Sequence, residues 1–395
     1  MTAVTDREQE LVHGVRRIAR EVAAANADDV DRSARFPAET VDALREQGAL
    51  SAFVPVALGG AGVPFHSLAV CCVELGRACG ASAMVFAMHQ IQVATLVRHL
   101  DPGSWHEGYL EKLAAEQRLI ASVTSEVGTG GDMSRSIAAV TPSDGGSVSF
   151  EKQAPTVSYG AYADDLLTTL RRSPDAESGD QVAALTHREQ NELEATGTWD
   201  VLGMRGTCSP GYVVRARFGS EQVLSTPFAR VASESMVPIS HVLWSHLWLG
   251  IAEDAFDRGR AFVRAAAKRA SDAGGANQLP SAQRLSRLSG ELAMLRALVA
   301  SGLQEFLACA EGPERERLST MGSTLRFNNL KIAASEQAGK ISRGALDVCG
   351  IMGFKNDSPF SVGRHLRDTL SAPLMVANER IHQTNAGLLL IAKEV

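Results

Sequence analysis

The stretch Leu366-Arg-Asp-Thr-Leu-Ser-Ala-Pro-Leu-Met-Val-Ala-Asn-Glu-Arg-Ile-His382, near the end of this chain of 395 residues, carries more information about the fold than any other. It opens on an arginine-aspartate pair and is then mainly apolar as far as Val376. Glu379 follows three residues later, so on helical backbone it would share a face with Val376 and lie one turn further along. The sequence therefore predicts an apolar residue and a carboxylate close together on one helix.

The composition indicates an enzyme-sized protein with a large core. Hydrophobic residues make up 45% of the chain and charged residues 21%, which leaves room for two or three domains. The net charge of -6 is spread along the sequence without a basic block. We therefore expect neither nucleic acid nor an anionic membrane surface as a partner, and small molecules are the favoured partners.

The cysteines indicate a reducing compartment. Six of them are present without a paired CxxC spacing or a Cys/His ligand pattern, and no signal peptide precedes them. We expect reduced, mostly buried thiols in a cytoplasmic protein, and no metal site. No apolar run reaches the roughly 18 residues that suggest a membrane helix, so we expect no membrane span.

Three domains are predicted from the spacing of apolar residues along the chain. Residues 1–118 carry apolar residues at helical spacing, residues 119–232 carry short β-type runs between polar turns, and residues 233–395 return to the helical period. The predicted strands cover Leu119 to Thr124, Ser147 to Glu151, Asp165 to Leu170, Gln181 to His187 and Tyr212 to Phe218.

Six stretches, in order, resemble motifs of the acyl-CoA dehydrogenase flavoproteins. Ser125-Glu-Val-Gly-Thr-Gly-Gly-Asp132 is similar to the family's TEPGAGSD motif, and Trp199-Asp-Val-Leu-Gly-Met-Arg-Gly-Thr-Cys-Ser209 to its W-x-x-x-G-x-R-x-T-x-S stretch. The others are Phe53 to Gly62, Lys152 to Thr156, Asp347 to Phe354 and the Arg367-Asp368 pair. The resemblance implies an α+β fold of the acyl-CoA dehydrogenase type, with an N-terminal α-helical domain, a middle antiparallel β-barrel or sandwich and a C-terminal four-helix bundle.

The resemblance also implies FAD, held between the β domain and the bundle and reached in part by a neighbouring subunit. A homodimer or homotetramer is therefore expected. By motif position, the residues that would bind the cofactor are Thr124, Ser125, Gly130, Thr156, Ser158, Asp347, Gly350 and Asn378, with Asp347 and Gly350 approaching the dinucleotide of the adjoining subunit. Without the resemblance, the hydroxyls would be assigned to strand ends that satisfy their own backbone, and Gly350 to a helix C-cap.

Several family positions are altered. Gly131 stands where the family has a serine that contacts bound acyl-CoA, and Asp347 where it has a glutamine. Val376, preceded by Met375, stands where most members carry the catalytic glutamate, and Ser240 occupies the position of the alternative base. Gly131, Met375 and Val376 would line the substrate site.

The loss of the base matters because a placed general base contributes typically ~10² to 10⁴-fold to such a reaction. In one interpretation the base has moved to Glu379, whose alternative role is an exposed partner of Arg380 or Lys393. His382 and His241 are weaker candidates, since a lone histidine in a helix is more often structural. In the other interpretation the reaction needs no proton abstraction.

The activity predicted on this basis is FAD-dependent αβ-desaturation of an acyl thioester carried by CoA or by an acyl carrier protein. A flavoprotein electron acceptor or oxygen would reoxidise the flavin, which makes the protein an oxidoreductase of CH–CH bonds. The first alternative is a flavin-dependent monooxygenase on the same fold. The second is an inactive or flavin-poor scaffold, suggested by Asp347 and by the lack of the family's R-x-x-F-G stretch.

Overall fold

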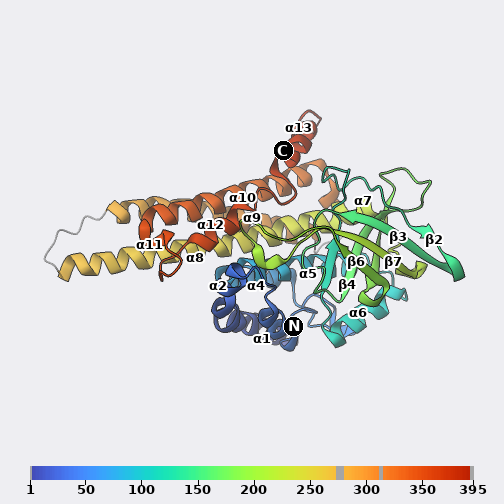
Figure 1. Cartoon of the computed structure of the whole chain (residues 1–395), viewed down its shortest axis with the longest axis horizontal. Helices are drawn as coiled ribbons and strands as arrows, with labels where there is room; N and C mark the ends of the chain where they lie inside the picture. The colour runs from blue at the N-terminus through green and yellow to red at the C-terminus, as the bar shows by residue number, and fades with distance from the viewer. Residues whose placement is uncertain (1, 273–279, 311–314, 392–395) are drawn as a thin grey trace.

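The computed structural model describes residues 2–272, 280–310 and 315–391, in the order helices, strands, helices (Figure 1). The first part is helical, with a π-helical turn at Ala19–Ala23 between its first two helices. Its helices are α1 (Thr2–Ile18), α2 (Ala24–Arg32), α3 (Ala38–Glu46), α4 (Phe65–Ala78), α5 (Gly80–Arg98) and α6 (Trp105–Glu116).

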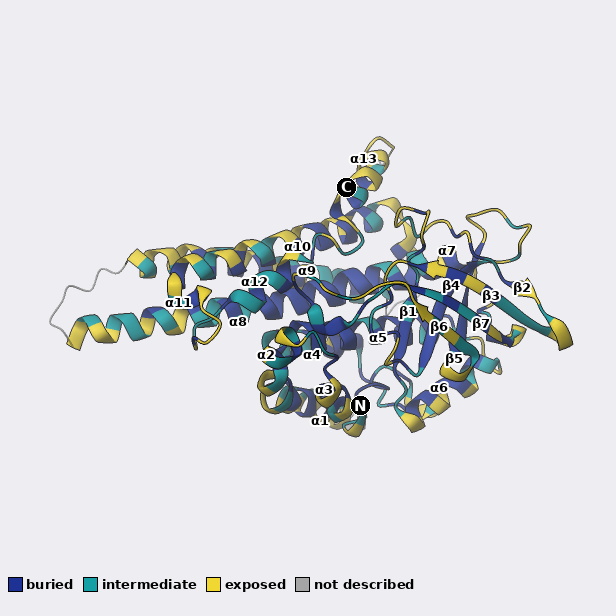
Figure 2. Cartoon of the chain, viewed as in Figure 1, coloured by how far each residue is buried: buried dark blue, intermediate teal, exposed yellow. Residues whose placement is uncertain are grey.

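Helix α5 is the centre of the molecule. Most of its residues are buried, because it packs against α4, α6, the strands and α8, and Figure 2 shows it dark blue along with much of α8. A helix that is apolar on all sides belongs in the core of a large protein. Helix α5 therefore contributes side chains to the interior on several sides, including the wall of the main cavity described below.

The middle part contains two sheets. A three-stranded sheet has the order β1-β4-β5 and a four-stranded sheet the order β2-β3-β7-β6. Strands β4 and β5 are buried over nearly their whole length, whereas β7 alternates between buried and less buried residues, as expected for a sheet with one face toward solvent. The strands are β1 (Ile120–Val123), β2 (Thr141–Pro142), β3 (Ser147–Ala154), β4 (Asp165–Arg171), β5 (Gln181–His187), β6 (Asn191–Ala195) and β7 (Tyr212–Gly219).

The expectation of a wholly antiparallel middle domain is wrong for one pair. Strands β1 and β4 are parallel, with Ile120 opposite Asp165 and Val123 opposite Thr168. Parallel neighbours need a long connection between them, and here the connection passes through β2 and β3 of the other sheet. The remaining pairs are antiparallel.

Three long helices dominate the C-terminal part and run beside one another away from the sheets (Figure 1). Helix α9 begins at a proline, which suits the first position of a helix, and α10 ends at Gly350, whose φ of 58° only glycine adopts readily. The predicted helical C-terminal domain is confirmed, built from three long helices and several short ones. They are α7 (Phe228–Val231), α8 (Val237–Asp272), α9 (Pro280–Ala310), α10 (Met321–Cys349), α11 (Ile351–Phe354), α12 (Gly363–Leu370) and α13 (Asn378–Leu389).

Two of the described helices, α5 and α9, are long and apolar enough to cross a membrane by length and composition alone. Helix α5 buries 89% of its apolar window inside the protein, and a core helix passes the same test. The corresponding window of α9 is only 28% buried. The expected absence of a membrane span thus stays a prediction.

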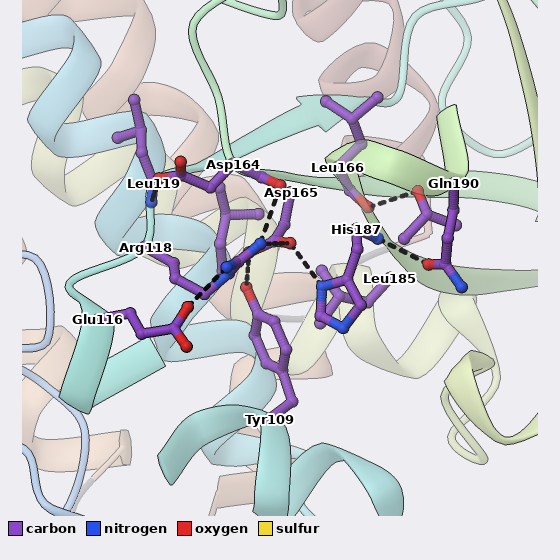
Figure 3. Close-up of polar contacts among 12 residues, drawn as sticks. Tyr109, Glu116, Arg118, Leu119, Asp164, Asp165, Leu166, Leu185, His187 and Gln190 are labelled. Atoms are coloured by element: carbon purple, nitrogen blue, oxygen red, sulfur yellow. Dashed lines mark hydrogen bonds and ion pairs between the residues drawn. The ribbon is translucent and has the colours of Figure 1, made fainter. Parts of the chain in front are cut away.

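The buried carboxylate of Asp165 connects α6 to the three-stranded sheet through hydrogen bonds (Figure 3). Asp165, the first residue of β4, is fully buried and accepts hydrogen bonds from Arg118 Nε at 2.7 Å, Arg118 Nη2 at 2.8 Å and the Tyr109 hydroxyl at 2.7 Å. His187 Nδ1 lies 2.7 Å from Asp165 Oδ1. Burial raises the pKa of Asp165, but the bonds from Arg118, His187 and Tyr109 outweigh it, so the pKa is lowered and the group stays charged.

Candidate active site

The main cavity has a volume of about 950 Å³ and lies where the helices meet the β domain. Its walls come from α5, from the loops after β1 and β3, from the 199–209 segment, from α7 to α8 and from the segment before α13. The structure brings eight of the predicted cofactor and substrate contacts into this wall. They are Thr124, Ser125, Gly130, Gly131, Thr156, Ser158, Met375 and Val376.

Hydroxyl groups form one side of the cavity. Ser125 Oγ donates to the carbonyl oxygen of Thr156 at 2.7 Å, and Ser209 Oγ donates to Ser158 Oγ at 2.9 Å. The Thr156 side chain is exposed to the cavity. Because each hydroxyl oxygen keeps lone pairs for a ligand, this side fits the polar edge of an isoalloxazine ring, which carries N–H and C=O groups.

A buried ion pair supports the hydroxyl side from behind. Lys152 Nζ lies 3.4 Å from Glu126 Oε2 and donates to the carbonyl oxygen of Thr169 at 2.7 Å. Glu126 also accepts from Ser136 Oγ and from the Ala138 backbone N–H, both at 2.6 Å. Burial lowers the pKa of Lys152 to about 8, and Glu126 partly opposes this effect. The ion pair therefore connects the loop that contains Ser125 to strand β3, which ends shortly before Thr156.

The two glycines of the loop adopt left-handed backbone conformations, with φ of 61° at Gly130 and 84° at Gly131. A Cβ atom added at Gly131 would lie 3.7 Å from Arg380 Nη1. Arg380, on α13, donates a hydrogen bond to the Gly130 carbonyl oxygen. An arginine therefore lies over the position where the resemblance places a serine that contacts acyl-CoA.

The segment before α13 is held by a buried lysine. Lys331 Nζ, on α10, donates to Asn378 Oδ1 at 2.6 Å and to the Ala372 carbonyl oxygen at 3.2 Å. Between these anchors, Val376 has a φ of 54° and Ala377 a φ of 40°, which is strained for residues with a side chain. Asn378 does not line the cavity, because its amide is engaged with Lys331 and α10; its cofactor-binding role stays a prediction that this placement does not support.

Both expected base positions lie in the cavity wall and neither holds a base. Val376 is one, and Ser240 is the other, with its hydroxyl donating to the Val237 carbonyl oxygen at 2.9 Å. Among the described residues of the wall, Asp132 is the only acidic one. Its carboxylate accepts from Ser134 Oγ at 2.6 Å and from Arg135 Nε at 2.9 Å, and its pKa is lowered, mainly by the Ser134 bond. A carboxylate with a lowered pKa is a weak base.

The proposed relocated base is not in the cavity. Glu379 is exposed on α13 and does not line the wall, so its catalytic role stays a prediction without geometric support. Of its expected partners, Arg380 contacts Gly130 instead, and Lys393 lies outside the described residues. His382 is exposed as well.

His241 does line the cavity, but as a neutral group. Its Nδ1 lies 3.1 Å from the Phe327 carbonyl oxygen, which only accepts, so Nδ1 carries the proton and Nε2 a lone pair. Burial, reinforced by the nearby charge of Lys331, lowers the pKa of His241 to about 3. The imidazole can therefore accept a hydrogen bond from a ligand at neutral pH without becoming charged.

Asp347 and Gly350 lie in a second hollow, of about 940 Å³, at the far end of α10. Asp347 pairs with Arg343 at 3.4 Å, and its carbonyl oxygen accepts from Arg284 at 2.9 Å. The structure therefore does not bring these two residues together with the other predicted cofactor contacts. The hollow is basic overall, with side chains of Arg284, Arg287, Lys340 and Arg343 in its wall.

Several wall residues were missed from the sequence. Gln92 on α5 and Trp244 on α8 are buried side chains that carry polar groups. Arg380 donates a hydrogen bond to the glycine loop. Trp244 lies in the mainly buried first half of α8, where no motif marks it. Within the described residues, no group of three His, Cys, Asp or Glu side chains could hold a metal ion. All six cysteines are free, and five of them are buried, as expected.

Comparison with known proteins places the chain among flavoproteins of one fold. Residues 5–117 match the family model for the N-terminal domain of acyl-CoA dehydrogenases. The probable FMNH2-dependent monooxygenase SfnC of Pseudomonas putida is 27% identical over 257 residues, which are 62% of this chain and 61% of that protein. The match thus spans about three fifths of the relative's own length.

Two kinds of enzyme share the whole fold. The dibenzothiophene monooxygenase TdsC of Paenibacillus sp. A11-2, solved with FMN and indole, superposes with a TM-score of 0.82 at 20% identity, covering 97% of each chain. Butyryl-CoA dehydrogenase of Megasphaera elsdenii superposes with a TM-score of 0.78 at 18% identity, covering 98% of each. At such identities the superpositions establish the fold alone, and the predicted fold class is confirmed.

Proposed function

The chain belongs to the acyl-CoA dehydrogenase-like flavoproteins, and within them we propose that it acts as a flavin-dependent monooxygenase. The cavity wall carries the proposal: Val376 and Ser240 stand at both base positions, and Asp132, the only acid among the described wall residues, is engaged by Ser134 and Arg135. Removal of a weakly acidic proton from carbon needs a placed base. A wall without one suits a reaction that adds oxygen instead.

A bound reduced flavin supplies two electrons to dioxygen, so that one oxygen atom enters the substrate and the other leaves as water. The protein's part is to bind, orient and exclude water. Ser125 and Thr156 would hold the polar edge of the ring through their hydroxyl oxygens. Met375, Val376 and Trp244 give the cavity apolar walls, which keep bulk water from the reacting atoms.

Reduced FMN is the flavin that this proposal favours. Two relatives support it, since SfnC is a probable FMNH2-dependent monooxygenase and TdsC was solved with FMN. FMN needs only the main cavity, whereas the adenosine half of FAD would need further contacts of the kind expected at Asp347 and Gly350. Those residues lie in the separate hollow, where Asp347 is paired with Arg343, so FAD would need that hollow of a neighbouring subunit beside the main cavity.

The test supplies the full chain with reduced FMN under ¹⁸O₂ and follows a panel of indole, dibenzothiophene and 2-naphthol by mass spectrometry. We expect one ¹⁸O atom in at least one product, only when reduced flavin is present. Omitting the protein, and adding catalase to remove free peroxide, controls for oxidation in solution. Oxidation that is unchanged without the protein, together with anaerobic bleaching of bound flavin by an acyl-CoA, would refute the proposal.

A second candidate is the FAD-dependent dehydrogenation of an acyl thioester on CoA or an acyl carrier protein, with a flavoprotein or oxygen as electron acceptor. One contact favours it: Asp368 Oδ1 accepts the Met204 N–H at 2.7 Å, so two elements that resemble those of the dehydrogenases pack together. For this candidate we expect butyryl-CoA to bleach FAD-loaded protein without oxygen. Val376→Glu should raise that rate by ~10² or more if only the base is lacking.

For this second candidate we also propose a homo-oligomer, because FAD in the main cavity would need the separate hollow at Asp347 and Gly350 of a neighbouring subunit. Light scattering on the purified chain tests this directly, and a monomeric mass at micromolar concentration would contradict it. Tight binding of either flavin would in turn remove the alternative of an inactive scaffold.

A further inference from the structure

Arg380 is the charged group of the main cavity wall that has no ion-pair partner in the described part of the chain. The charged side chains of that wall are Asp132, Arg367 and Arg380. Asp132 pairs with Arg135 at 2.9 Å, and Arg367 pairs with Asp31. Arg380 instead donates a hydrogen bond to a neutral backbone carbonyl oxygen. The described wall therefore carries one positive charge that no protein carboxylate balances.

The guanidinium group of Arg380 is accessible to a ligand. Arg380 is partly exposed, and its Nη2 is the nitrogen that donates to the Gly130 carbonyl oxygen. Its Nε and Nη1 have no hydrogen-bond partner among the described residues, and neither belongs to the unpaired polar atoms that are fully buried. A guanidinium carries N–H groups on all three nitrogens. The N–H groups on Nε and Nη1 are therefore exposed and free to donate.

The glycine loop adds further donors beside this guanidinium. A Cβ atom added at Gly131 would lie 3.7 Å from Nη1, and one added at Gly130 would lie 3.6 Å from Nη2. Both glycines are exposed and line the cavity, so the guanidinium lies next to the cavity surface. The backbone N–H groups of Gly130 and Gly131 have no acceptor among the described residues either. Successive free N–H groups in a turn can bind an anion.

We propose that Arg380 determines substrate specificity, and that the substrate is an apolar molecule with one anionic group, such as a carboxylate, which binds to Arg380 beside the glycine loop. A carboxylate matches the planar fork of a guanidinium and forms charge-assisted hydrogen bonds with it. Much of the remaining wall is apolar, with Met84, Ile91 and Phe327 among its members, which suits the rest of such a molecule. This proposal rests on the proposed function, because it places the substrate in the cavity that would hold the flavin.

The phosphate group of FMN is also an anion, so the first test separates it from a substrate carboxylate. Riboflavin is FMN without the phosphate, and the affinity of the full chain for each flavin is measured by fluorescence quenching. We expect Arg380→Met to keep both affinities within about twofold of wild type. A loss of FMN affinity with unchanged riboflavin affinity would assign Arg380 to the flavin phosphate and overturn the proposal.

The second test compares the binding of 2-naphthoate and of 2-naphthamide, its uncharged amide of nearly the same shape, to the full chain with saturating oxidised FMN. We expect wild type to bind 2-naphthoate about 10-fold more tightly, as one hydrogen bond to a charged group would give. Arg380→Met removes the charge, so it should bind the two probes equally. Arg380→Lys should keep part of the preference, because an ammonium group retains the charge without the planar fork.

Arg215→Met is the matched control. Arg215 lies on β7, does not line the cavity and pairs with Glu151 at 2.7 Å, so this variant loses the same single charge and should keep the wild-type preference. Salt gives a measurement on wild type alone. Because Arg380 is partly exposed, raising the salt concentration from about 0.02 to about 0.5 M should weaken the binding of 2-naphthoate and leave that of 2-naphthamide nearly unchanged.

The proposal is overturned if wild type binds the two probes equally or not at all, or if Arg380→Met keeps the wild-type preference. An equal response of both probes to salt overturns it even where Arg380→Met does not fold. None of these measurements depends on oxygen transfer. A protein that binds 2-naphthoate as expected but oxygenates no substrate would refute the proposed function and leave the anion site standing. Oxygen transfer without any preference for 2-naphthoate would do the reverse.

Discussion

Replacing Lys331 by methionine tests whether a buried ammonium group holds the strained segment beside the cavity. Lys331 is fully buried, and its Nζ donates to the Ala372 carbonyl oxygen and to Asn378 Oδ1, at the two ends of the segment that contains Val376. The same ammonium lies 5.8 Å from the centre of the Trp248 ring, a distance at which a cation is attracted to the ring face. Methionine keeps the length of the side chain and removes both hydrogen bonds and the charge.

Burial lowers the pKa of Lys331 from its ordinary 10.5 to about 8, with a smaller opposing effect of Glu336. The unfolded chain therefore holds this proton more tightly than the folded one, and the charged lysine opposes folding at every pH below about 8. The penalty shrinks as pH rises from about 8 toward 10.5. At about 1.36 kcal/mol per tenfold change, it is about 3 kcal/mol at pH 7 and about 1 kcal/mol at pH 9.5.

Two effects oppose each other in Lys331→Met at pH 7. Removing the charge recovers about 3 kcal/mol, whereas two buried acceptors lose their donor at about 1 to 3 kcal/mol each. The net change in unfolding free energy therefore lies between a gain of about 1 kcal/mol and a loss of about 3 kcal/mol. The pH dependence is the sharper signature, because wild type should gain about 2 kcal/mol relative to Lys331→Met between pH 7 and 9.5.

Urea unfolding followed by tryptophan fluorescence at both pH values measures this difference. Lys340→Met is the matched control, since Lys340 is on the same helix, 62% exposed and paired with Glu291 at the surface. The control should show no such change with pH. If wild type and Lys331→Met respond equally to pH, the lysine is not a buried charge in the folded state, and its role as an anchor of the segment is refuted.

Asp165→Asn breaks the buried cluster at the start of β4 and should cost about 3 to 5 kcal/mol of unfolding free energy at neutral pH. Because the folded state lowers the pKa of Asp165, this contribution is fully present above the ordinary pKa of 3.8 and is lost as pH falls through the lower pKa of the folded state, so the two proteins should converge in acid. Tyr109→Phe removes one hydrogen bond to the same carboxylate and should cost about 1 kcal/mol by the same urea assay. Glu379→Gln should leave flavin binding and turnover within about twofold of wild type, because the side chain is exposed and outside the cavity. Loss of flavin reduction with retained flavin would instead identify Glu379 as the base.

The fold could be predicted well because local patterns and long-range packing agree over most of the chain. The five predicted strands match β1, β3, β4, β5 and β7 to within a few residues. Strand β6 was missed, since Asn191-Glu-Leu-Glu-Ala195 is rich in glutamate, and charged residues are common on the edge strand that it forms. The parallel pairing of β1 and β4 was also missed, because nothing local in a strand records the direction of its partner.

The site was predicted in part, and the misses have a common cause. Ser125, Thr156 and Val376 were found through motifs, and the structure brings all three to one cavity. Gln92 and Trp244 lie within helices where they interrupt an apolar pattern, and no motif marks them. What distinguishes them is a buried polar atom without a partner. Whether a buried polar group has a partner depends on the tertiary structure, so sequence patterns do not reveal it.

The parallel pair of β1 and β4 has a consequence for the order in which the chain folds. Strand β1 directly follows α6, but its partner is synthesised only after β2 and β3, and closing such a loop costs entropy before the pair gains contacts. Asp165 is the first residue of β4, and its partner Arg118 lies two residues before β1. We expect the amide protons of β4 to gain protection from exchange later in refolding than those of α5, and Asp165→Asn to delay them further. The buried carboxylate is then a determinant of folding rate as well as of stability.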